Sequence, residues 1–363
     1  MSDKEFIDKL SQCDFFAGNR KNFYETAEKT SVLVCGTHKE PAPLVSIIIT
    51  TYKRPQWLKI ALDSALGQEG FDDYEVIIVD NEGESLDVET ETSRLVCSYH
   101  DNKIVYYRNL PSVLYRADTA ISLSRSKWFC IVHDDDFVSK DHLKRMTDIL
   151  LERPDIGYLA CSHQSFGTND EASCWAQSRE NVESPYSLVF YPAKSVCVGC
   201  WPGWLGALIN REDYIDMGGM SLPFVTGIGD LIAIMKYMDR YNNVYCASMK
   251  FPTYFYRVST AQQSAGGSEQ WLRFYMAEYM FHKYLNKRYH PNSPSFWNYI
   301  ASIIIHDKIK DNERRKIWLK GGSIDTALLE QLAGLPMRNG RGIRRWVGKR
   351  LLSFIRRRYI KAS

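Results

Sequence analysis

A repeated alternation along the chain limits its fold more than any other feature. Short apolar runs rich in β-branched residues are followed by segments whose apolar residues recur with helical periodicity. The apolar runs are residues 45–50, 74–79, 104–107, 128–132 and 156–161. One helix-like segment begins at Pro55, and two others cover residues 113–124 and 140–151. This alternation predicts an α/β fold with a largely parallel, doubly wound sheet that has helices on both faces.

The segments on either side of this pattern have a different character. Residues 1–43 look like a mixed helical extension, and residues 162–200 look irregular. Aromatic-rich helical patterns occupy 271–284 and 297–318. The 363 residues suffice for one large domain or two smaller ones. We therefore expect an N-terminal extension, a sheet domain, a helical C-terminal region and a tail, with the bounds 1–43, 44–267, 268–335 and 336–363.

Several features of the composition indicate a cytoplasmic protein. No apolar run is long enough to form a membrane-spanning helix, and the N-terminal residues lack the pattern of a signal peptide. The nine cysteines are scattered and odd in number, as is typical of reduced thiols. Cys197 and Cys200 have the spacing of half a zinc or redox site, but no second pair follows, so we expect no metal there.

The C-terminal tail carries the basic charge of the chain. From residue 331 to the end there are ten Lys or Arg and no Asp or Glu. Residues 343–360 have helical periodicity, with one apolar side formed by Ile343, Trp346, Val347, Leu351, Phe354 and Ile355. Such a helix lies in a membrane interface and is attracted by anionic lipid. A solvated helix docked on the protein and a nucleic-acid-binding helix are the alternatives, and the Trp and Phe of the stripe favour the membrane.

Polar clusters follow three of the expected strands. They are Thr50–Tyr52, Asp80–Asn81 and Asp134–Asp136. Ligands of open α/β sheets bind outside the carboxyl ends of the strands, where these clusters meet. Three consecutive carboxylates repel one another unless a positive group lies among them, and divalent cations prefer such oxygen ligands. The alternative is that Asp136 caps the helix that follows.

Four motifs follow one another along the chain: V-S-I-I-I-T-T-Y-K-R-P, E-V-I-I-V-D-N, H-D-D-D-F and a downstream G-D. In this order they resemble the motifs of the family 2 glycosyltransferases of the GT-A fold, in particular those of bacterial surface polysaccharides. The resemblance covers about residues 44–264. It implies a Rossmann-like mixed sheet in the domain 44–267, with a helical N-terminal extension and a helical C-terminal region outside it.

The resemblance implies a nucleotide site at the ends of the first strands. Thr50 and Tyr52 match the turn that lines the nucleotide pocket, and Asp80 and Asn81 match an acidic pair that holds base and ribose. Asn81 stands where the family often has Asp, and its amide is compatible with uracil or thymine. Arg116 lies near the position of a nucleotide-contacting arginine.

The resemblance also implies a metal site. Asp134 and Asp136 match the D-x-D motif, whose carboxylates hold Mn²⁺ or Mg²⁺ against the diphosphate of the donor. Asp135, between them, is expected to contact the ribose or the metal. His133 is expected to pack at the end of its strand rather than to bind the metal.

The remaining expected site residues lie downstream. Asp230 matches the catalytic base, although Gly229 replaces the glutamate that usually precedes it. Arg257 is expected to grip the diphosphate, and Ser259 stands in place of a histidine. Trp204 and Gly206 belong to a segment that resembles the acceptor side of the site.

Together these expectations describe a metal-dependent inverting glycosyltransferase. The donor would be a UDP-hexose or UDP-N-acetylhexosamine, with dTDP-rhamnose as the alternative. The acceptor would be the hydroxyl of a glycan, expected to be lipid-linked, in the synthesis of a polysaccharide such as capsule, O-antigen or lipopolysaccharide. The enzyme would lie peripherally on the inner face of the cell membrane and bind no nucleic acid. A non-catalytic module that binds a nucleotide or glycan is the second hypothesis, because Gly229 and Ser259 depart from the family pattern.

Overall fold

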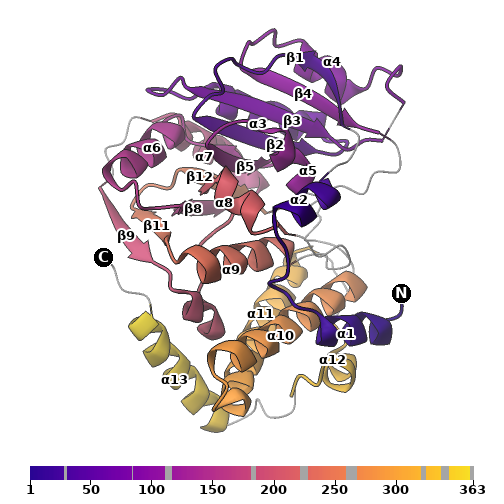
Figure 1. The fold of residues 1–363 in the computed structure, drawn as a ribbon, viewed down its shortest axis with the longest axis vertical. Helices are drawn as coiled ribbons and strands as arrows, with labels where there is room; N and C mark the ends of the chain where they lie inside the picture. The colour runs from indigo at the N-terminus through magenta and orange to yellow at the C-terminus, as the bar shows by residue number, and fades with distance from the viewer. Residues whose placement is uncertain are drawn as a thin grey trace.

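The computed structural model centres on one nine-stranded mixed sheet (Figure 1). It describes residues 1–27, 31–83, 85–110, 117–180, 185–220, 228–258, 268–319, 324–336 and 343–359. The strand order is β1-β4-β3-β2-β5-β10-β7-β11-β9. A separate three-stranded sheet has the order β6-β12-β8. The predicted α/β architecture is therefore confirmed.

Four parallel strands form the half of the sheet that the sequence pattern predicts most directly. They are β2 (Val45–Thr51), β3 (Tyr74–Asp80), β4 (Ile104–Asn109) and β5 (Trp128–His133). Every residue of β3 is buried, as expected for a strand that has helices on both faces. The helices that alternate with these strands are α3 (Pro55–Leu66), α4 (Glu91–Cys97), α5 (Ala117–Leu123) and α6 (His142–Glu152). The carboxyl ends of β2, β3 and β5 therefore meet at one edge.

The other half of the sheet is mixed. β10 (Leu208–Asn210) runs antiparallel to both β5 and β7 (Tyr158–Cys161), and β11 (Val244–Met249) runs parallel to β7. The outermost strand is β9 (Tyr186–Phe190), antiparallel to β11. Two helices accompany these strands, α8 (Arg211–Asp216) and α9 (Gly229–Tyr241).

The prediction that residues 162–200 are irregular is wrong. They contain β8 (His163–Phe166), α7 (Glu171–Ser178), β9 and two 3₁₀ turns, η1 (Thr168–Asp170) and η2 (Ala193–Val198). β8 pairs with β12 (Tyr254–Arg257), which also pairs with β6 (Phe137–Val138). Strands of two to five residues are too short to show a clear alternation. The small sheet places β12 beside the carboxyl end of β5.

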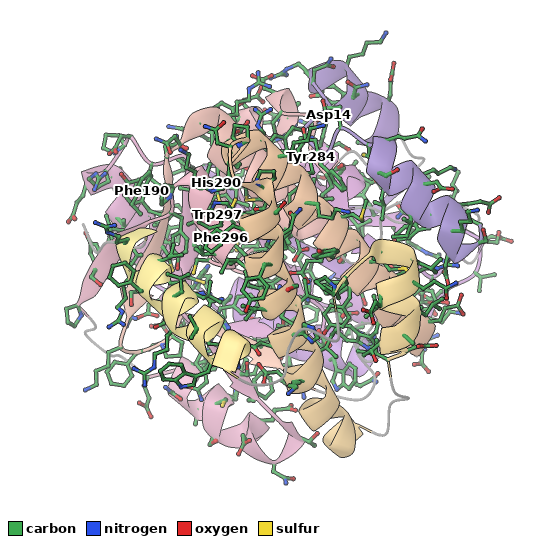
Figure 2. All side chains as sticks on the ribbon, turned by 90° about the horizontal axis from the view of Figure 1, so that it is seen from below. Asp14, Phe190, Tyr284, His290, Phe296 and Trp297 are labelled. Carbon is green, nitrogen blue, oxygen red and sulfur yellow. The ribbon has the colours of Figure 1, made fainter. Side chains whose placement is uncertain are left out.

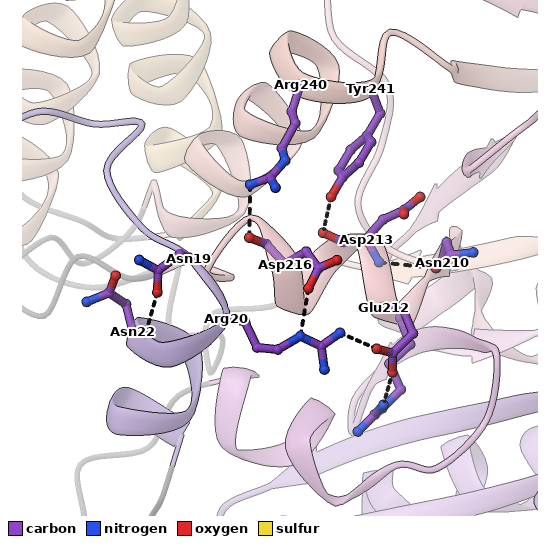
Figure 3. Close-up of polar contacts among 10 residues, drawn as sticks. Asn19, Arg20, Asn22, Asn210, Glu212, Asp213, Asp216, Arg240 and Tyr241 are labelled. Atoms are coloured by element: carbon purple, nitrogen blue, oxygen red, sulfur yellow. Dashed lines mark hydrogen bonds and ion pairs between the residues drawn. The ribbon is translucent and has the colours of Figure 1, made fainter.

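The N-terminal extension is only partly helical. α1 (Asp3–Gln12) and α2 (Arg20–Ala27) are followed by β1 (Ser31–Gly36), which pairs antiparallel with β4 at the edge of the main sheet. Figure 3 shows how α2 is fastened: Arg20 forms ion pairs with Glu212 and Asp216 of α8. Arg240 of α9 in turn donates to the Asp216 carbonyl over 2.9 Å. The extension therefore supports the helix that begins beside Asp230.

Four helices form the C-terminal region. They are α10 (Ser268–Tyr289), α11 (Pro294–Leu319), α12 (Thr326–Ala333) and α13 (Ile343–Tyr359). Figure 2 shows His290 and Trp297 close together at the connection of α10 to α11, and their rings stack at 3.9 Å. α10 and α11 share one hydrophobic core with α9 and η2. Across the described residues, every helix is too short or too polar to cross a lipid bilayer.

Candidate active site

A metal-ligating cluster lies at the carboxyl end of β5. One side-chain ligand atom each from His133, Asp135 and Asp136 lies within 4.8 Å of the others. Asp135 and Asp136 are buried, whereas the His133 side chain is 44% exposed. The sequence predicted Asp134 and Asp136 as the metal pair and a packing role for His133. The geometry instead brings His133 and Asp135 together with Asp136.

Asp136 is held in place by β12. The Tyr254 hydroxyl donates to Asp136 Oδ2 over 2.7 Å, and the Arg257 backbone N–H donates to Asp136 Oδ1 over 2.7 Å. Burial raises the pKa of the Asp136 carboxyl to about 7, although His133, Tyr254 and Arg257 favour the charged form. A carboxylate that needs further positive charge is suited to binding a cation. The capping alternative does not hold, because α6 begins at His142 and its N-cap residue is Asp141.

Asp134 faces the turn after β2. Its carboxylate accepts from the Thr51 hydroxyl over 2.9 Å and from Arg54 Nη1 over 3.4 Å. Arg54 also lies 3.6 Å from Asp135. Sequence reasoning included Thr51 in the Thr50–Tyr52 cluster without giving it a role, and it gave none to Arg54, although both stand in the T-T-Y-K-R-P motif. Arg54 therefore contacts the carboxylates of both Asp134 and Asp135.

Asp135 provides the test of whether a metal fits. Its Oδ2 is buried and has no hydrogen-bond partner among the residues that the structure describes. Its carbonyl oxygen accepts from Arg257 Nε over 2.7 Å, which fixes the backbone of the turn. A buried carboxylate oxygen that accepts no hydrogen bond and has only the 3.6 Å ion pair with Arg54 is costly unless a ligand satisfies it. Two carboxylates and an imidazole are a suitable donor set for Mn²⁺, and the carboxylates also suit Mg²⁺.

The expected nucleotide residues line the same edge of the sheet. Tyr52 is 57% exposed, and Thr50 is partly exposed. Asp80 is buried and accepts from the Tyr106 hydroxyl over 2.8 Å, and burial raises the pKa of its carboxyl. Asn81 Oδ1 accepts a hydrogen bond from Asn109, so the NH₂ group of Asn81 is the part of the amide that can donate to a nucleotide. Arg116 and Ser259 lie outside the described residues.

Arg257 is more deeply buried than we expected for a residue that grips the diphosphate. Its guanidinium forms an ion pair with Glu171 of α7 and lies over the rings of Trp57 and Phe166, at 5.4 and 4.9 Å. The side chain is 3% exposed. Glu171 and Trp57 were missed by sequence reasoning, because nothing in their local pattern distinguishes them from surface and core residues. Arg257 thus fixes the Asp135–Asp136 turn as well as placing positive charge beside it.

Asp230 stands at the start of α9. It is exposed, yet protein surrounds it closely enough that burial raises the pKa of its carboxyl. The Leu231 N–H, His133 and Lys308 act in the opposite direction, so the metal cluster and α11 both lie within electrostatic reach of Asp230. Such a carboxylate can accept a proton from a bound hydroxyl.

The two residues expected on the acceptor side have packing roles. Trp204 is 7% exposed and packs against Phe129 and Tyr214, so its ring belongs to the core. Gly206 has φ +70°, and a Cβ there would lie 2.6 Å from the Tyr254 ring. The contact of Trp204 with the acceptor stays a prediction, since these core residues cover most of its ring. Gly206 lets the chain pass closely behind Tyr254, which holds Asp136.

Comparison with known proteins identifies the type of sheet domain. Residues 46–201 match the model of the family "Glycosyl transferase family 2". An uncharacterised protein of Sinorhizobium fredii, y4gI, is 31% identical over 121 residues, which are 32% of this chain and 13% of that protein. The chain therefore spans only a small part of that relative.

Solved structures share the fold. S. aureus TarS 1-349, crystallised with UDP-GlcNAc, aligns with a TM-score of 0.50 and 15% identity, over 71% of this chain and 70% of its own. This likeness confirms the predicted GT-A architecture. A mannosyltransferase from Pyrobaculum calidifontis, in complex with GDP-Man and Mn²⁺, aligns over 98% of this chain and 97% of its own with 15% identity. Its TM-score of 0.44 is too low to carry an argument about this chain.

Proposed function

Because residues 46–201 belong to the family 2 glycosyltransferases, we propose that the chain is a metal-dependent enzyme that moves a sugar from a nucleotide donor to a glycan hydroxyl. The observation that carries the proposal is the cluster of His133, Asp135 and Asp136 at the carboxyl edge of the sheet. Asp136 and Asp135 would hold Mn²⁺ or Mg²⁺, with His133 as the third ligand. The cation would neutralise charge on the departing diphosphate.

Other residues of the chain would accept the proton and provide positive charge beside the diphosphate. Asp230 accepts the proton of the acceptor hydroxyl, whose oxygen forms a bond to the anomeric carbon. The bond from that carbon to the diphosphate breaks, and the electron pair leaves with the diphosphate oxygen. Attack opposite the leaving group inverts the anomeric centre. Arg54 and Arg257 place positive charge on two sides of the Asp134–Asp136 turn, where the diphosphate would lie.

The nucleotide is proposed to be UDP, carrying a hexose or N-acetylhexosamine. Asn81 supports a pyrimidine, because the Asn109 contact occupies its amide oxygen and leaves its NH₂ group to donate to a ring carbonyl. Uracil and thymine both offer such carbonyls, so dTDP-rhamnose remains the second candidate. Tyr52, exposed beside this edge, provides a surface for the base or ribose.

A release assay tests the reaction class. The full chain, Mn²⁺ and a panel of UDP-, dTDP- and GDP-sugars are incubated with and without a lipid-diphosphate glycan, and free nucleoside diphosphate is measured. We expect one donor to be consumed, and EDTA to stop its consumption, because the buried carboxylates cannot hold the diphosphate without a cation. Added Mn²⁺ should restore turnover. Binding of a sugar nucleotide without any release would favour the non-catalytic module instead.

The acceptor is proposed to be lipid-linked, because α13 presents an apolar and basic face to solvent. Leu352 is buried, and Arg356 Nε donates to the Val198 carbonyl over 2.7 Å, so one face is docked. The opposite face exposes Trp346 (59%) and Phe354 (54%), together with Val347 and Leu351. Arg350 and Arg358 lie over the two aromatic rings. This face suits the interface of an anionic membrane, which would place the enzyme at the inner surface of the cell membrane.

Flotation with vesicles tests the membrane contact. Replacing Trp346 and Phe354 together with Ser should lower partition onto vesicles containing anionic lipid by about tenfold or more, because two large apolar side chains no longer leave water. The wild-type protein should bind zwitterionic vesicles more weakly than vesicles that contain anionic lipid. The control variant replaces Val32 and Leu33 with Ser, since these residues are 37% and 46% exposed on β1, at the edge of the sheet. Equal losses in both variants would contradict a specific role of α13.

A further inference from the structure

A lysine of the C-terminal helices has an arrangement that packing alone does not explain. Lys308 of α11 forms an ion pair with Glu278 of α10, which is fully buried. The second carboxylate oxygen, Glu278 Oε2, has no hydrogen-bond partner among the described residues. Replacing a buried ion pair by apolar side chains is often neutral or stabilising, so this pair has no evident structural advantage. The other end of the pair reaches solvent, because the Lys308 side chain is 32% exposed.

Lys308 meets an aromatic ring at its exposed end. The Lys308 ammonium lies 4.1 Å from the centre of the Trp201 ring, and Trp201 is itself partly exposed. An ammonium has three N–H donors, and Glu278 is its one hydrogen-bond partner within the described ranges. The indole N–H of Trp201 is a further donor. A place that exposes positive charge and N–H donors suits an oxyanion such as a phosphate or a carboxylate.

Trp201 lies on a segment that connects two parts of the protein. At one end of the segment, the Val198 carbonyl accepts from Arg356 of α13 over 2.7 Å. At the other end, the Gly206 N–H donates over 3.0 Å to the Ile131 carbonyl of β5, the strand whose carboxyl end carries the metal cluster. Five residues of extended chain span at most about 17 Å, so Trp201 cannot lie farther than that from Gly206.

The segment with Trp201 and the expected nucleotide residues lie on opposite sides of the metal cluster. The order of the central strands is β3-β2-β5-β10-β7. The expected nucleotide residues follow β2 and β3, whereas the Trp201 segment leads into β10, on the other side of β5. Lys308 is also within electrostatic reach of Asp230, the expected base. An oxyanion bound by Lys308 is therefore expected on the acceptor and not on the donor.

We infer that Lys308 and Trp201 form a subsite for an oxyanion of the acceptor, and that Glu278 fixes Lys308 for this task. In a lipid-linked glycan the oxyanion is the phosphate between lipid and sugar. The parts of the protein follow the same order: α13 faces the membrane, Lys308 binds the phosphate, and the metal cluster with Asp230 receives the reacting hydroxyl. The carboxylate of an acidic sugar is the other source of such a group. The inference rests on the proposed function, whose acceptor class it names.

Calorimetry with three probes that share one alkyl chain tests the subsite without turnover. Octyl phosphate, octyl glucuronide and neutral octyl glucoside are titrated into the metal-free full chain. Lys308→Met should weaken the binding of octyl phosphate about 10- to 100-fold, the usual contribution of a hydrogen bond to a charged group, and leave octyl glucoside unchanged. Lys308→Arg should restore most of the binding. The matched control is Lys310→Met, at an exposed position of the same helix, which should bind all three probes as wild type does.

Two further variants keep the test decisive if Lys308→Met does not fold. The double variant Lys308→Met with Glu278→Gln leaves no unpaired carboxylate in the interior and should show the same loss of octyl phosphate binding. Trp201→Phe keeps an aromatic ring beside Lys308 and removes only the indole N–H. Its loss should be smaller, about two- to tenfold, as for a neutral hydrogen bond.

The charged probes separate the two sources of the oxyanion. A loss with either of them supports the subsite: a loss confined to octyl phosphate assigns it to the phosphate of a lipid-linked acceptor, and a loss confined to octyl glucuronide assigns it to an acidic sugar. Equal losses with all three probes would reveal a structural role of Lys308 and overturn the inference. Unchanged binding of all three would overturn it as well.

Transfer assays distinguish a failure of this inference from a failure of the proposed function. With a lipid-diphosphate glycan as acceptor, Lys308→Met should raise the acceptor KM about 10- to 100-fold and leave kcat and the donor KM nearly unchanged. If wild type transfers no sugar but Lys308→Met loses octyl phosphate binding, the proposed function fails and the subsite stands. If wild type transfers sugar and Lys308→Met changes neither probe binding nor the acceptor KM, the inference is overturned.

Discussion

Replacing Asp136 with Asn should reduce metal-dependent transfer by about 10³-fold or more while making the metal-free protein more stable. The loss of activity follows because a cation on the diphosphate provides several kcal/mol of transition-state stabilisation, and Asn offers a much weaker ligand. The fold should survive, because Asn fits both existing contacts: its oxygen accepts from the Arg257 N–H, and its NH₂ donates to the Tyr254 hydroxyl. Donor turnover with saturating Mn²⁺ measures the first effect.

The gain in stability should depend on pH. The pKa of Asp136 is about 7 in the folded metal-free protein, well above its ordinary value of 3.8. The folded state therefore binds a proton more tightly than the unfolded state. The stability that this proton contributes is fully present below pH 3.8 and is lost as the pH rises through about 7. Asn carries no charge at any pH, so the variant should gain roughly 1–3 kcal/mol at pH 8 and about a third of that at pH 5.

Thermal unfolding in EDTA at pH 5 and pH 8 checks this expectation. The control is Asp141→Asn, which changes a nearby aspartate that is partly exposed and paired with Arg145. That variant should keep its transfer activity and gain no stability at pH 8. An Asp136→Asn enzyme that keeps full Mn²⁺-dependent turnover would exclude Asp136 from the metal site.

The sequence predicted the parallel half of the sheet well, because those strands are buried on both faces and their composition shows it. The runs that became β2, β3 and β5 needed no tertiary information to be recognised. β1 was missed although its residues 32–35 form a short apolar run, because the surrounding segment was interpreted as helical. As an edge strand it leaves Val32, Leu33 and Val34 exposed. The three-stranded sheet was missed because it pairs β12 with two short strands that lie far away in the sequence.

The polar clusters that the sequence predicted for the site end at one edge of the sheet, but the contacts within it depend on turn geometry that a motif does not encode. The Thr51 hydroxyl donates to Asp134, and the backbone of β12 donates to Asp136, while His133 and Asp135 place ligand atoms close to those of Asp136.

Asp230→Asn is expected to lower kcat by about 10²–10⁴-fold, the usual contribution of a general base, while leaving donor affinity unchanged. The reason is spatial: Asp230 belongs to α9, whereas the cluster that would hold the metal and diphosphate belongs to the turn after β5. Asn can accept a hydrogen bond from the acceptor hydroxyl but cannot take its proton. In this variant the rate of sugar transfer should therefore fall, whereas the Kd of the nucleotide measured with Mn²⁺ should stay unchanged.

The matched control is Asp239→Asn, in the last turns of the same helix. Asp239 is bound by Arg288 and Tyr289, so its loss disturbs α9 without touching the site. It should cost some stability and leave kcat almost unchanged. If Asp230→Asn weakens nucleotide binding as much as it slows transfer, Asp230 acts on the donor and not on the acceptor. If it transfers sugar at the wild-type rate, another group accepts the proton.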